Sequence, residues 1–342
     1  MRQQRKGVLE RGPARRLTMV VAVAAAACAL FAGAAQASVI SIGSVLPQKF
    51  EATEFKRVQT LFNTALPEAG ATIASPANGA IVRWRVQGAS GGPFFLRVLH
   101  PNGKGGYEAS GTSQGATPGD EGLQTFTTNL EVRAGDLIGI DPSHDTDKIG
   151  VAEAAGAGYA SIFPPPFDGS VVPASETFSG KEIELSAEIQ PQPEVTTVSP
   201  PFGSIAGGTA VTITGVNFTQ ASEVKFGAIP AGFTVGSDTE ITATVPRSAK
   251  PGKVDISVTT FAGTSPNTRF DDYTYLACVV PNLRNRPLKQ AKRLLRRQGC
   301  KLGHVKKVKA PNAKKVGKVL KQAPKPGRIL NPGARVRIQL GR

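Results

Sequence analysis

The sequence predicts a chain that is mostly β-structure, arranged as two β-sandwiches followed by a small α+β module with one helix. Glycine and proline supply 38 and 26 of the 342 residues, which favours many turns over long helices. Apolar residues occur in short alternating runs between Gly, Pro, Asn and Asp, as in half-buried strands. Helical spacing of apolar residues appears near the C-terminus, at Leu288, Ala291, Leu294 and Leu295. We therefore expect more than one domain, each with its own core.

Residues 1–37 have the pattern of an export signal. Six Lys and Arg residues come first, residues 17–37 carry no charge, and residues 35–37 read Ala-Gln-Ala before Ser38. We expect cleavage after Ala37 and a mature protein that is secreted or held in the cell envelope. The alternative is an uncleaved signal that anchors the chain in the membrane, since the apolar run approaches the length needed to cross a bilayer.

Residues 45–190 predict a β-sandwich that is jelly-roll-like. The clearest strand-like runs are 81–86, 94–99, 123–130, 137–140 and 183–189. In the first run, Val82, Trp84 and Val86 alternate with Ile81, Arg83 and Arg85. We expect the Val and Trp side chains to face the core and the others to face solvent, so Trp84 is a core residue and not a sugar platform.

The same domain offers weak candidates for a site. Asp141, Asp145 and Asp147 cluster with His144, and such carboxylates could bind Ca²⁺ or cap their own turn. His100 is expected in a loop. Candidates for exposed aromatic contacts are Tyr107, Tyr159 and the loop 163–167, Phe-Pro-Pro-Pro-Phe. Carboxylates that could serve a glycan-cleaving enzyme are Glu51, Glu54, Glu131 and Asp136. No catalytic residue and no cofactor is assigned.

Residues 191–193 read as a linker, and residues 194–276 alternate strands and turns over the size of an immunoglobulin-like sandwich. The pattern Val198-Ser-Pro, Gly207-Gly-Thr, 211–215 Val-Thr-Ile-Thr-Gly and Asn217-Phe218 resembles the IPT/TIG domain, and the match continues to Ala262-Gly263. The resemblance implies an immunoglobulin-like fold. Some members of that family bind DNA and others are spacers or interaction modules. Five basic and seven acidic residues make a DNA-binding face a poor expectation here.

Residues 278–342 predict a β-α-β-β-β module. Pro287 is expected at the first position of the helix, Gly299 ends it, and strands are expected at 300–308, 316–322 and 334–340. Val280-Pro-Asn-Leu283, Gly299-Cys-Lys-Leu-Gly303, 322–327 Gln-Ala-Pro-Lys-Pro-Gly and Pro332-Gly333 make the segment similar to a PASTA domain. That family occurs on bacterial penicillin-binding proteins and surface receptor kinases and is associated with peptidoglycan fragments and β-lactams. The resemblance therefore implies a bacterial cell-wall location.

Two cysteines, Cys278 and Cys300, remain once the signal with Cys28 is removed. An even number in an oxidising compartment predicts a disulfide, joining the first strand to the residue after the helix. Closing a loop of this length would stabilise the module by about 3 kcal/mol.

The charge is concentrated in the same module. Residues 1–37 have a net charge of +5, residues 38–277 of −9, and residues 278–342 of +20, with no acidic residue. A surface of this kind attracts polyanions. We expect the contacts to come from the basic residues of the helix and of the segment after it: Lys289, Lys292, Arg293, Arg296, Arg297, Lys306, Lys307, Lys314, Lys315 and Lys318. The module has no Phe, Tyr or Trp on which bases could stack, which disfavours nucleic acid as the partner.

The sequence therefore favours a non-catalytic, secreted envelope protein whose basic module binds peptidoglycan or another anionic wall polymer. The sandwiches would act as spacers or interaction modules. Two alternatives stay open, both in residues 45–190: a carbohydrate-binding adhesin, with a glycan or a protein as partner, or a glycan-active enzyme. A membrane partner is expected only if the signal is uncleaved.

Overall fold

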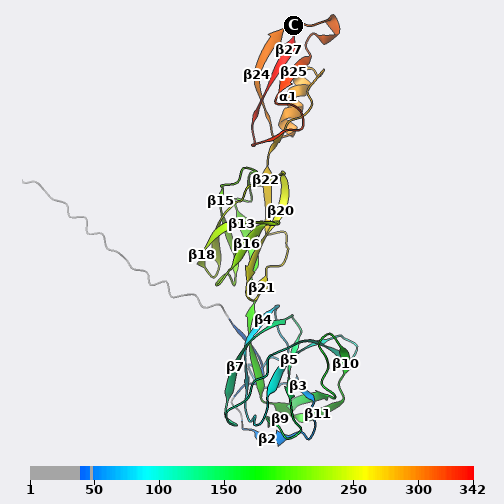
Figure 1. Ribbon diagram of the computed structural model, residues 1–342, viewed down its shortest axis with the longest axis vertical. Helices are drawn as coiled ribbons and strands as arrows, with labels where there is room; N and C mark the ends of the chain where they lie inside the picture. Colours follow the sequence, from blue (N-terminus) through cyan, green and yellow to red (C-terminus); the bar gives the residue numbers. More distant parts are fainter. Residues whose placement is uncertain (1–38, 47–48) are drawn as a thin grey trace, which may run out of the picture. The chain divides into compact units, whose positions relative to one another are not determined.

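The computed structural model describes residues 39–46 and 49–342 (Figure 1). The predicted signal segment and its cleavage site lie outside these residues. The described chain consists mostly of strands, which form three groups, each with a buried core of its own. This confirms the predicted fold class. Among the described residues, none of the helices has the length and apolar character that a membrane crossing requires.

The first sandwich consists of a four-stranded and an eight-stranded sheet with the main core between them. The smaller sheet has the order β1 (Ile40–Gly43), β12 (Leu185–Pro191), β4 (Gly79–Val86) and β7 (Gln124–Val132). The larger sheet has the order β10 (Val171–Pro173), β6 (Gly106–Thr112), β5 (Phe94–Pro101), β8 (Leu137–Pro142), β3 (Thr60–Ala65), β9 (Lys148–Ile162) and β11 (Glu176–Ile183), with β2 (Glu51–Glu54) pairing with β9. Trp84 is buried in this core, as predicted.

Strand β4 departs from the predicted alternation. Ile81 was expected to face solvent with Arg83 and Arg85, but it is fully buried. In the pairing of β4 with β12, Ile81 lies opposite Ile189 and Arg83 opposite Glu188, so β4 has one extra residue there, and this β-bulge resets which of its side chains face inward. Beyond the bulge the prediction is correct, because Trp84 and Val86 are buried while Arg83 and Arg85 contact Glu188 on β12.

The second sandwich consists of two sheets. One has the order β13 (Glu194–Ser199), β15 (Ala210–Val216), β19 (Glu240–Thr244) and β18 (Gly232–Ser237). The other has the order β14 (Phe202–Ser204), β22 (Asp272–Leu276), β20 (Gly252–Thr260), β16 (Glu223–Phe226) and β17 (Ile229–Pro230), with β21 (Gly263–Thr264) pairing with β20. Val211 and Ile213 are buried while Thr212 and Thr214 are half-buried, as the alternation predicts. Pro191, predicted in the linker, belongs to β12, so only residues 192 and 193 separate the last strand of the first sandwich from β13.

The third group of strands shares a core with the helix α1 (Leu288–Arg297). A three-stranded sheet has the order β24 (Lys301–Val308), β27 (Arg335–Gly341) and β25 (Val319–Ala323), and β23 (Cys278–Val279) pairs with β26 (Ile329–Leu330). Residues 313–315, between β24 and β25, form the short 3₁₀ helix η1 (Ala313–Lys315). Strand β25 therefore begins later than expected.

The ends of α1 follow from local chemistry. Pro287 has extended backbone angles, so it caps the helix from outside and is not its first residue, as we had expected. Gly299 lies just past the helix with φ +67°, a conformation that favours glycine. The helix buries Ala291 and Leu295 in the same core as Val336 and Ile338 of β27. Leu288 and Leu294 are half-buried and pack against this core, so the charged residues of the helix lie on its other positions.

Candidate polyanion-binding surface

The helix α1 presents a row of cations to solvent. Lys289, Lys292, Arg293, Arg296 and Arg297 are all exposed, while the opposite side of the helix carries the buried Ala291 and Leu295. This division is the one the sequence predicts for an amphipathic helix. We call these five side chains the helix face. All five belong to the predicted polyanion-binding set.

A second row of cations lies on the other side of the module, which we call the sheet face. On β27, Arg335 and Arg337 are exposed and alternate with the buried Val336 and Ile338. Lys301 of β24 is the register partner of Arg335, and Lys321 of β25 is that of Gln339. Because alternate residues of a strand point to opposite sides, these exposed cations point away from the side of the sheet that packs on α1. The predicted set omits Lys301, Lys321, Arg335 and Arg337, although the Arg-Val-Arg-Ile alternation could have revealed the two arginines.

The rest of the predicted set is spread over other elements. Lys306 is exposed on β24 opposite Gln339, so it shares the sheet face with Lys321. Lys307 is exposed on β24, and Lys314 is exposed in η1. Lys315 is half-buried and donates to Asn285 Oδ1 over 2.5 Å. Lys318 is half-buried just before β25. The structure therefore groups the helix cations together, but it does not gather the whole predicted set on one patch.

The cations of this module have no acidic neighbours along the chain. Residues 278–342 contain 20 Lys and Arg residues and no Asp or Glu. Within the part of the chain that the structure describes, every ion pair found lies outside this module. An external polyanion would therefore neutralise charges that the fold leaves mutually repulsive.

The disulfide between Cys278 and Cys300 is present, which confirms the prediction. Both residues are buried in the core of the module. The bond holds β23 against the end of α1, where the Val279 N–H also donates to the Gln298 carbonyl over 3.0 Å. The disulfide therefore fixes the position of α1, the helix that carries the helix face, against β23.

Two of the three aspartates of the weak Ca²⁺ candidate, Asp141 and Asp147, make contacts within the protein. Asp141 is buried and accepts two hydrogen bonds from Arg97, at 3.0 and 2.5 Å. Its burial raises the carboxyl pKa, while the guanidinium of Arg97 acts in the opposite direction. Asp147 accepts from the backbone N–H groups of Gly92, Ser143 and His144. Asp145 is exposed. Asp147 caps the turn, which is the structural role that the sequence left open, while Asp141 pairs with a buried arginine that the sequence did not indicate.

The aromatic candidates divide into buried and exposed groups. Tyr159 is buried and stacks on Phe178, with 4.6 Å between ring centroids, so its predicted exposure is wrong. Tyr107 packs edge-on against the buried Phe62. Phe167 is 86% exposed, and Phe163 lies beneath the guanidinium of Arg57. The loop 163–167 thus keeps one large apolar side chain fully in solvent.

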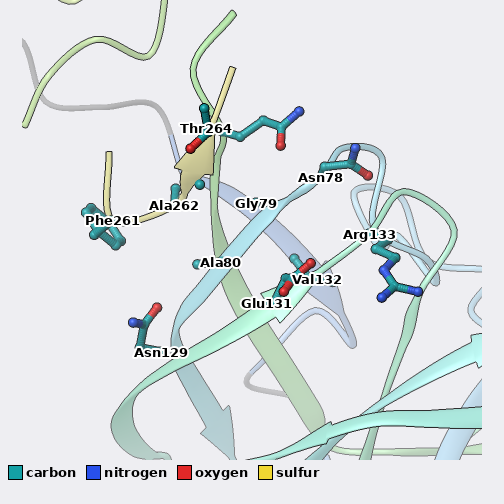
Figure 2. A pocket seen from close by; sticks show the side chains of 12 residues that line it. Asn78, Gly79, Ala80, Asn129, Glu131, Val132, Arg133, Phe261, Ala262 and Thr264 are labelled. Carbon is teal, nitrogen blue, oxygen red and sulfur yellow. The ribbon is translucent and has the colours of Figure 1, made fainter. Parts of the chain in front are cut away.

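The carboxylates considered for glycan cleavage lie on separate elements. Glu51 and Glu54 are exposed on β2, which belongs to the larger sheet. Glu131 is exposed on β7 of the smaller sheet, opposite Ala80 of β4 (Figure 2). Asp136 is buried and bound to His100 Nδ1 over 2.6 Å. His100 itself lies within β5, not in the loop where it was expected.

A pair of buried acids was missed by the sequence analysis. Glu182 and Glu184 flank the junction of β11 and β12, and both are fully buried. Ser44 Oγ lies 2.5 Å from an oxygen of Glu182 and 3.5 Å from one of Glu184. Alternating acids in a strand normally mark a solvent face, so nothing in the local pattern 182–184 signalled their burial.

The chain resembles parts of solved structures at low sequence identity. No curated protein matches the chain. A gamma-CGTase from alkalophilic Bacillus clarkii is 18% identical over 66% of this chain and 28% of its own, with a TM-score of 0.23. The extracellular region of plexin A4 is 15% identical over 60% of this chain and 18% of its own, with a TM-score of 0.25. The chain thus spans less than a third of either protein.

Two family models match the C-terminal part of the chain, in the order that the sequence predicts. PASTA domains occur in cell-envelope proteins, so these matches support a cell-envelope protein built largely of β-sandwiches. Residues 193–275 form an IPT/TIG domain, and residues 279–342 form the PASTA domain that follows it.

Proposed function

We propose that this is a non-catalytic, secreted cell-envelope protein whose PASTA domain binds peptidoglycan or another anionic wall polymer. In this proposal the first sandwich and the IPT/TIG domain act as spacers or interaction modules. The observation that carries the proposal is the distribution of charge. Exposed cations occupy both the helix face and the sheet face of a domain that contains no acidic residue. The association of PASTA domains with wall components supports the same partner.

The charge also sets the expected chemistry of binding. Cations that neutralise a polyanion release its counterions, so affinity falls as salt rises in proportion to the charges neutralised. Exposed pairs are weakened at physiological salt, where the Debye length is about 8 Å. A specific wall contact therefore has to keep part of its affinity at that salt concentration.

The test is co-sedimentation of the chain 38–342 with purified bacterial cell walls at stepped salt, beside the chain 38–277. Walls extracted with acid, which removes phosphate-bearing polymers, form a parallel series. The proposal expects binding that needs residues 278–342 and persists at physiological salt. If extraction abolishes binding, the partner is the phosphate-bearing polymer. If binding is retained, the partner is peptidoglycan. Equal binding by both chains would contradict the proposal.

One observation favours a second candidate, a carbohydrate-binding adhesin acting through residues 45–190. Phe167 in the loop 163–167 is 86% exposed, and aromatic side chains at such a site can pack against a sugar ring or a partner protein. Under this proposal, Phe167→Ala reduces wall or glycan binding while the PASTA domain is intact. Binding that depends on residues 278–342 and is insensitive to Phe167→Ala would eliminate this candidate.

A further inference from the structure

Three aspartates meet at one edge of the IPT/TIG domain. Asp255 on β20 and Asp272 on β22 are direct register partners in an antiparallel pair of strands. Asp271 precedes β22, and its carbonyl accepts from the Ile256 N–H over 2.8 Å. One carboxylate oxygen from each of the three lies within 4.8 Å of the others. Like charges placed opposite one another on neighbouring strands destabilise a sheet, so this arrangement needs a compensating cation.

The second observation is the state of the Asp271 carboxylate. Its residue is 1% exposed. Oδ2 accepts from the Thr268 N–H over 3.1 Å, but Oδ1 is buried without a hydrogen-bond partner. A buried carboxylate oxygen that no donor satisfies costs stability, and a metal ion is a group that would satisfy it.

The groups that face the cluster leave it short of positive charge. Lys253 Nζ lies 2.9 and 3.0 Å from the two oxygens of Asp272. Asn267 Nδ2 donates to Asp255 Oδ2 over 2.5 Å and contributes no charge. Three carboxylates and one ammonium leave a net charge of −2. The Lys253 side chain is 64% exposed and Asn267 is exposed, so both can move aside.

We propose that Asp255, Asp271 and Asp272 form a binding site for a divalent cation, with Ca²⁺ the expected ion. Oxygens that bind one Ca²⁺ at about 2.3–2.6 Å lie at most about 5 Å apart, which fits the observed spacing. Three carboxylates supply three or more of the six to eight oxygens that Ca²⁺ takes, and water completes the shell. Ca²⁺ tolerates irregular geometry better than Mg²⁺ does. With this few protein ligands, the dissociation constant for Ca²⁺ should lie near the millimolar values of extracellular modules.

The test uses the chain 38–342 freed of metal with a chelator, and Tb³⁺ as the probe. Tyr273 follows Asp272 directly and Tyr275 lies two residues further on, so tyrosine excitation should sensitise the emission of Tb³⁺ bound at the cluster. We expect this emission to be displaced by millimolar Ca²⁺. Asp255→Asn should weaken it at least tenfold, while Glu240→Gln, at an exposed acid on β19 of the same domain, should leave it unchanged. Lys253→Gln removes the competing ammonium and should tighten binding severalfold.

Stability supplies a second measurement. At ten times the dissociation constant, Ca²⁺ should raise the thermal midpoint of this domain by about 6–11 °C, and NaCl at equal ionic strength should not. Because Asp255 is half-buried, the Asp255→Asn variant needs a folding control. A thermal midpoint in chelator equal to that of the natural chain shows that the variant folds. Equal Tb³⁺ emission from Asp255→Asn and Glu240→Gln, or a midpoint that Ca²⁺ raises no more than NaCl does, would overturn the proposal.

Discussion

Cys278 and Cys300 are joined across the end of helix α1, so the disulfide closes a loop that contains the whole helix. Next to the disulfide, Gly299 lies against the backbone of Ala277, where a Cβ atom on residue 299 would overlap the Ala277 carbonyl oxygen. A covalent bond and a glycine thus fix one close approach. The PASTA domain needs such constraints, because it is small and carries 20 like charges.

Replacing both cysteines, as Cys278→Ala with Cys300→Ala, should destabilise the PASTA domain by about 3 kcal/mol, since the bond closes a loop over a sequence separation of 22 residues. Residues 278–342 contain no aromatic side chain, so hydrogen exchange followed by mass spectrometry is the measurement. Protection should fall in peptides from 278–342 and stay constant in 194–276. A reductant should have the same effect on the natural chain and none on the variant. Unchanged protection would contradict a stabilising role.

Gly299→Ala should cost more than about 2 kcal/mol in the same exchange experiment. The residue has φ +67°, and the added Cβ also meets the Ala277 backbone, which cannot swing away as a side chain can. Gly327→Ala is the matched control. Its φ is +83°, but a Cβ there meets open space, so only the conformational cost of about 1 kcal/mol is expected. Equal losses at the two positions would show that the close approach has no energetic effect.

The two cationic faces can be compared by removing four charges from each. One variant carries Gln at Lys301, Lys321, Arg335 and Arg337, and the other at Lys292, Arg293, Arg296 and Arg297. We expect the sheet-face variant to bind walls at least about tenfold more weakly than the natural chain, because each cation near an anionic surface contributes about 1 kcal/mol. We expect the helix-face variant to lose less affinity. Lys301 and Arg335 are cross-strand neighbours whose repulsion a bound polyanion would relieve. Co-sedimentation at stepped salt measures both variants. Equal losses would mean that net charge alone determines binding.

Tyr275 makes the IPT/TIG domain sensitive to alkali. Its ring is buried, Oη donates to the Pro246 carbonyl over 3.0 Å, and burial raises the pKa to about 12, with Tyr273 adding to the effect. The folded state therefore favours the neutral phenol. Its contribution to stability is complete below pH 10 and is lost as the pH rises from the unfolded value of 10.0 toward 12.

Tyr275→Phe removes the hydrogen bond and should lower the free energy of unfolding by about 1 kcal/mol at pH 7. As the pH rises from 9 to 11, the stability of this variant should fall less than that of the natural chain. Unfolding in denaturant at each pH measures this, with Tyr107→Phe, in the first sandwich, as the control. An alkaline loss of the same size in Tyr275→Phe and the natural chain would contradict the assignment.

The sequence was informative where one residue pattern determines one local structure. The alternation around Val211 and Ile213, the apolar spacing of α1 and the glycine after it predicted elements that the structure contains. The cysteine count was sufficient for the disulfide because residues 39–342 contain two cysteines, and these two are bonded.

Other features depend on pairing between distant segments. Ile81 is buried because of a bulge in the pairing of β4 with β12. Strand β9 was missed because its Ala and Gly residues lack the β-branched and aromatic side chains that mark a strand. Asp255 and Asp271 lie 16 positions apart, and only the β20–β22 register shows that they meet.

Arg97 is the residue of the first sandwich whose loss should be most costly. It is 7% exposed and binds the buried Asp141 and the exposed Asp168, the latter over 2.8 Å. Arg97→Met would leave the Asp141 carboxylate buried without a cation, which should destabilise the domain by about 3–5 kcal/mol at pH 7. Asp168→Asn removes only the exposed partner and should cost less than about 1 kcal/mol. Denaturant unfolding followed by the fluorescence of Trp84, the single tryptophan, measures both variants.

The cost of Arg97→Met should also depend on pH. The pKa of Asp141 is already raised from 3.8 by burial, and removing the guanidinium raises it further. A folded state that holds this proton more tightly than the unfolded state has its full stability below about pH 4 and loses it as the pH rises through the folded pKa. The difference between Arg97→Met and the natural chain should therefore narrow as the pH falls from 7 toward 4. A difference independent of pH would show that packing of the arginine stem, and not the buried charge of Asp141, accounts for the loss.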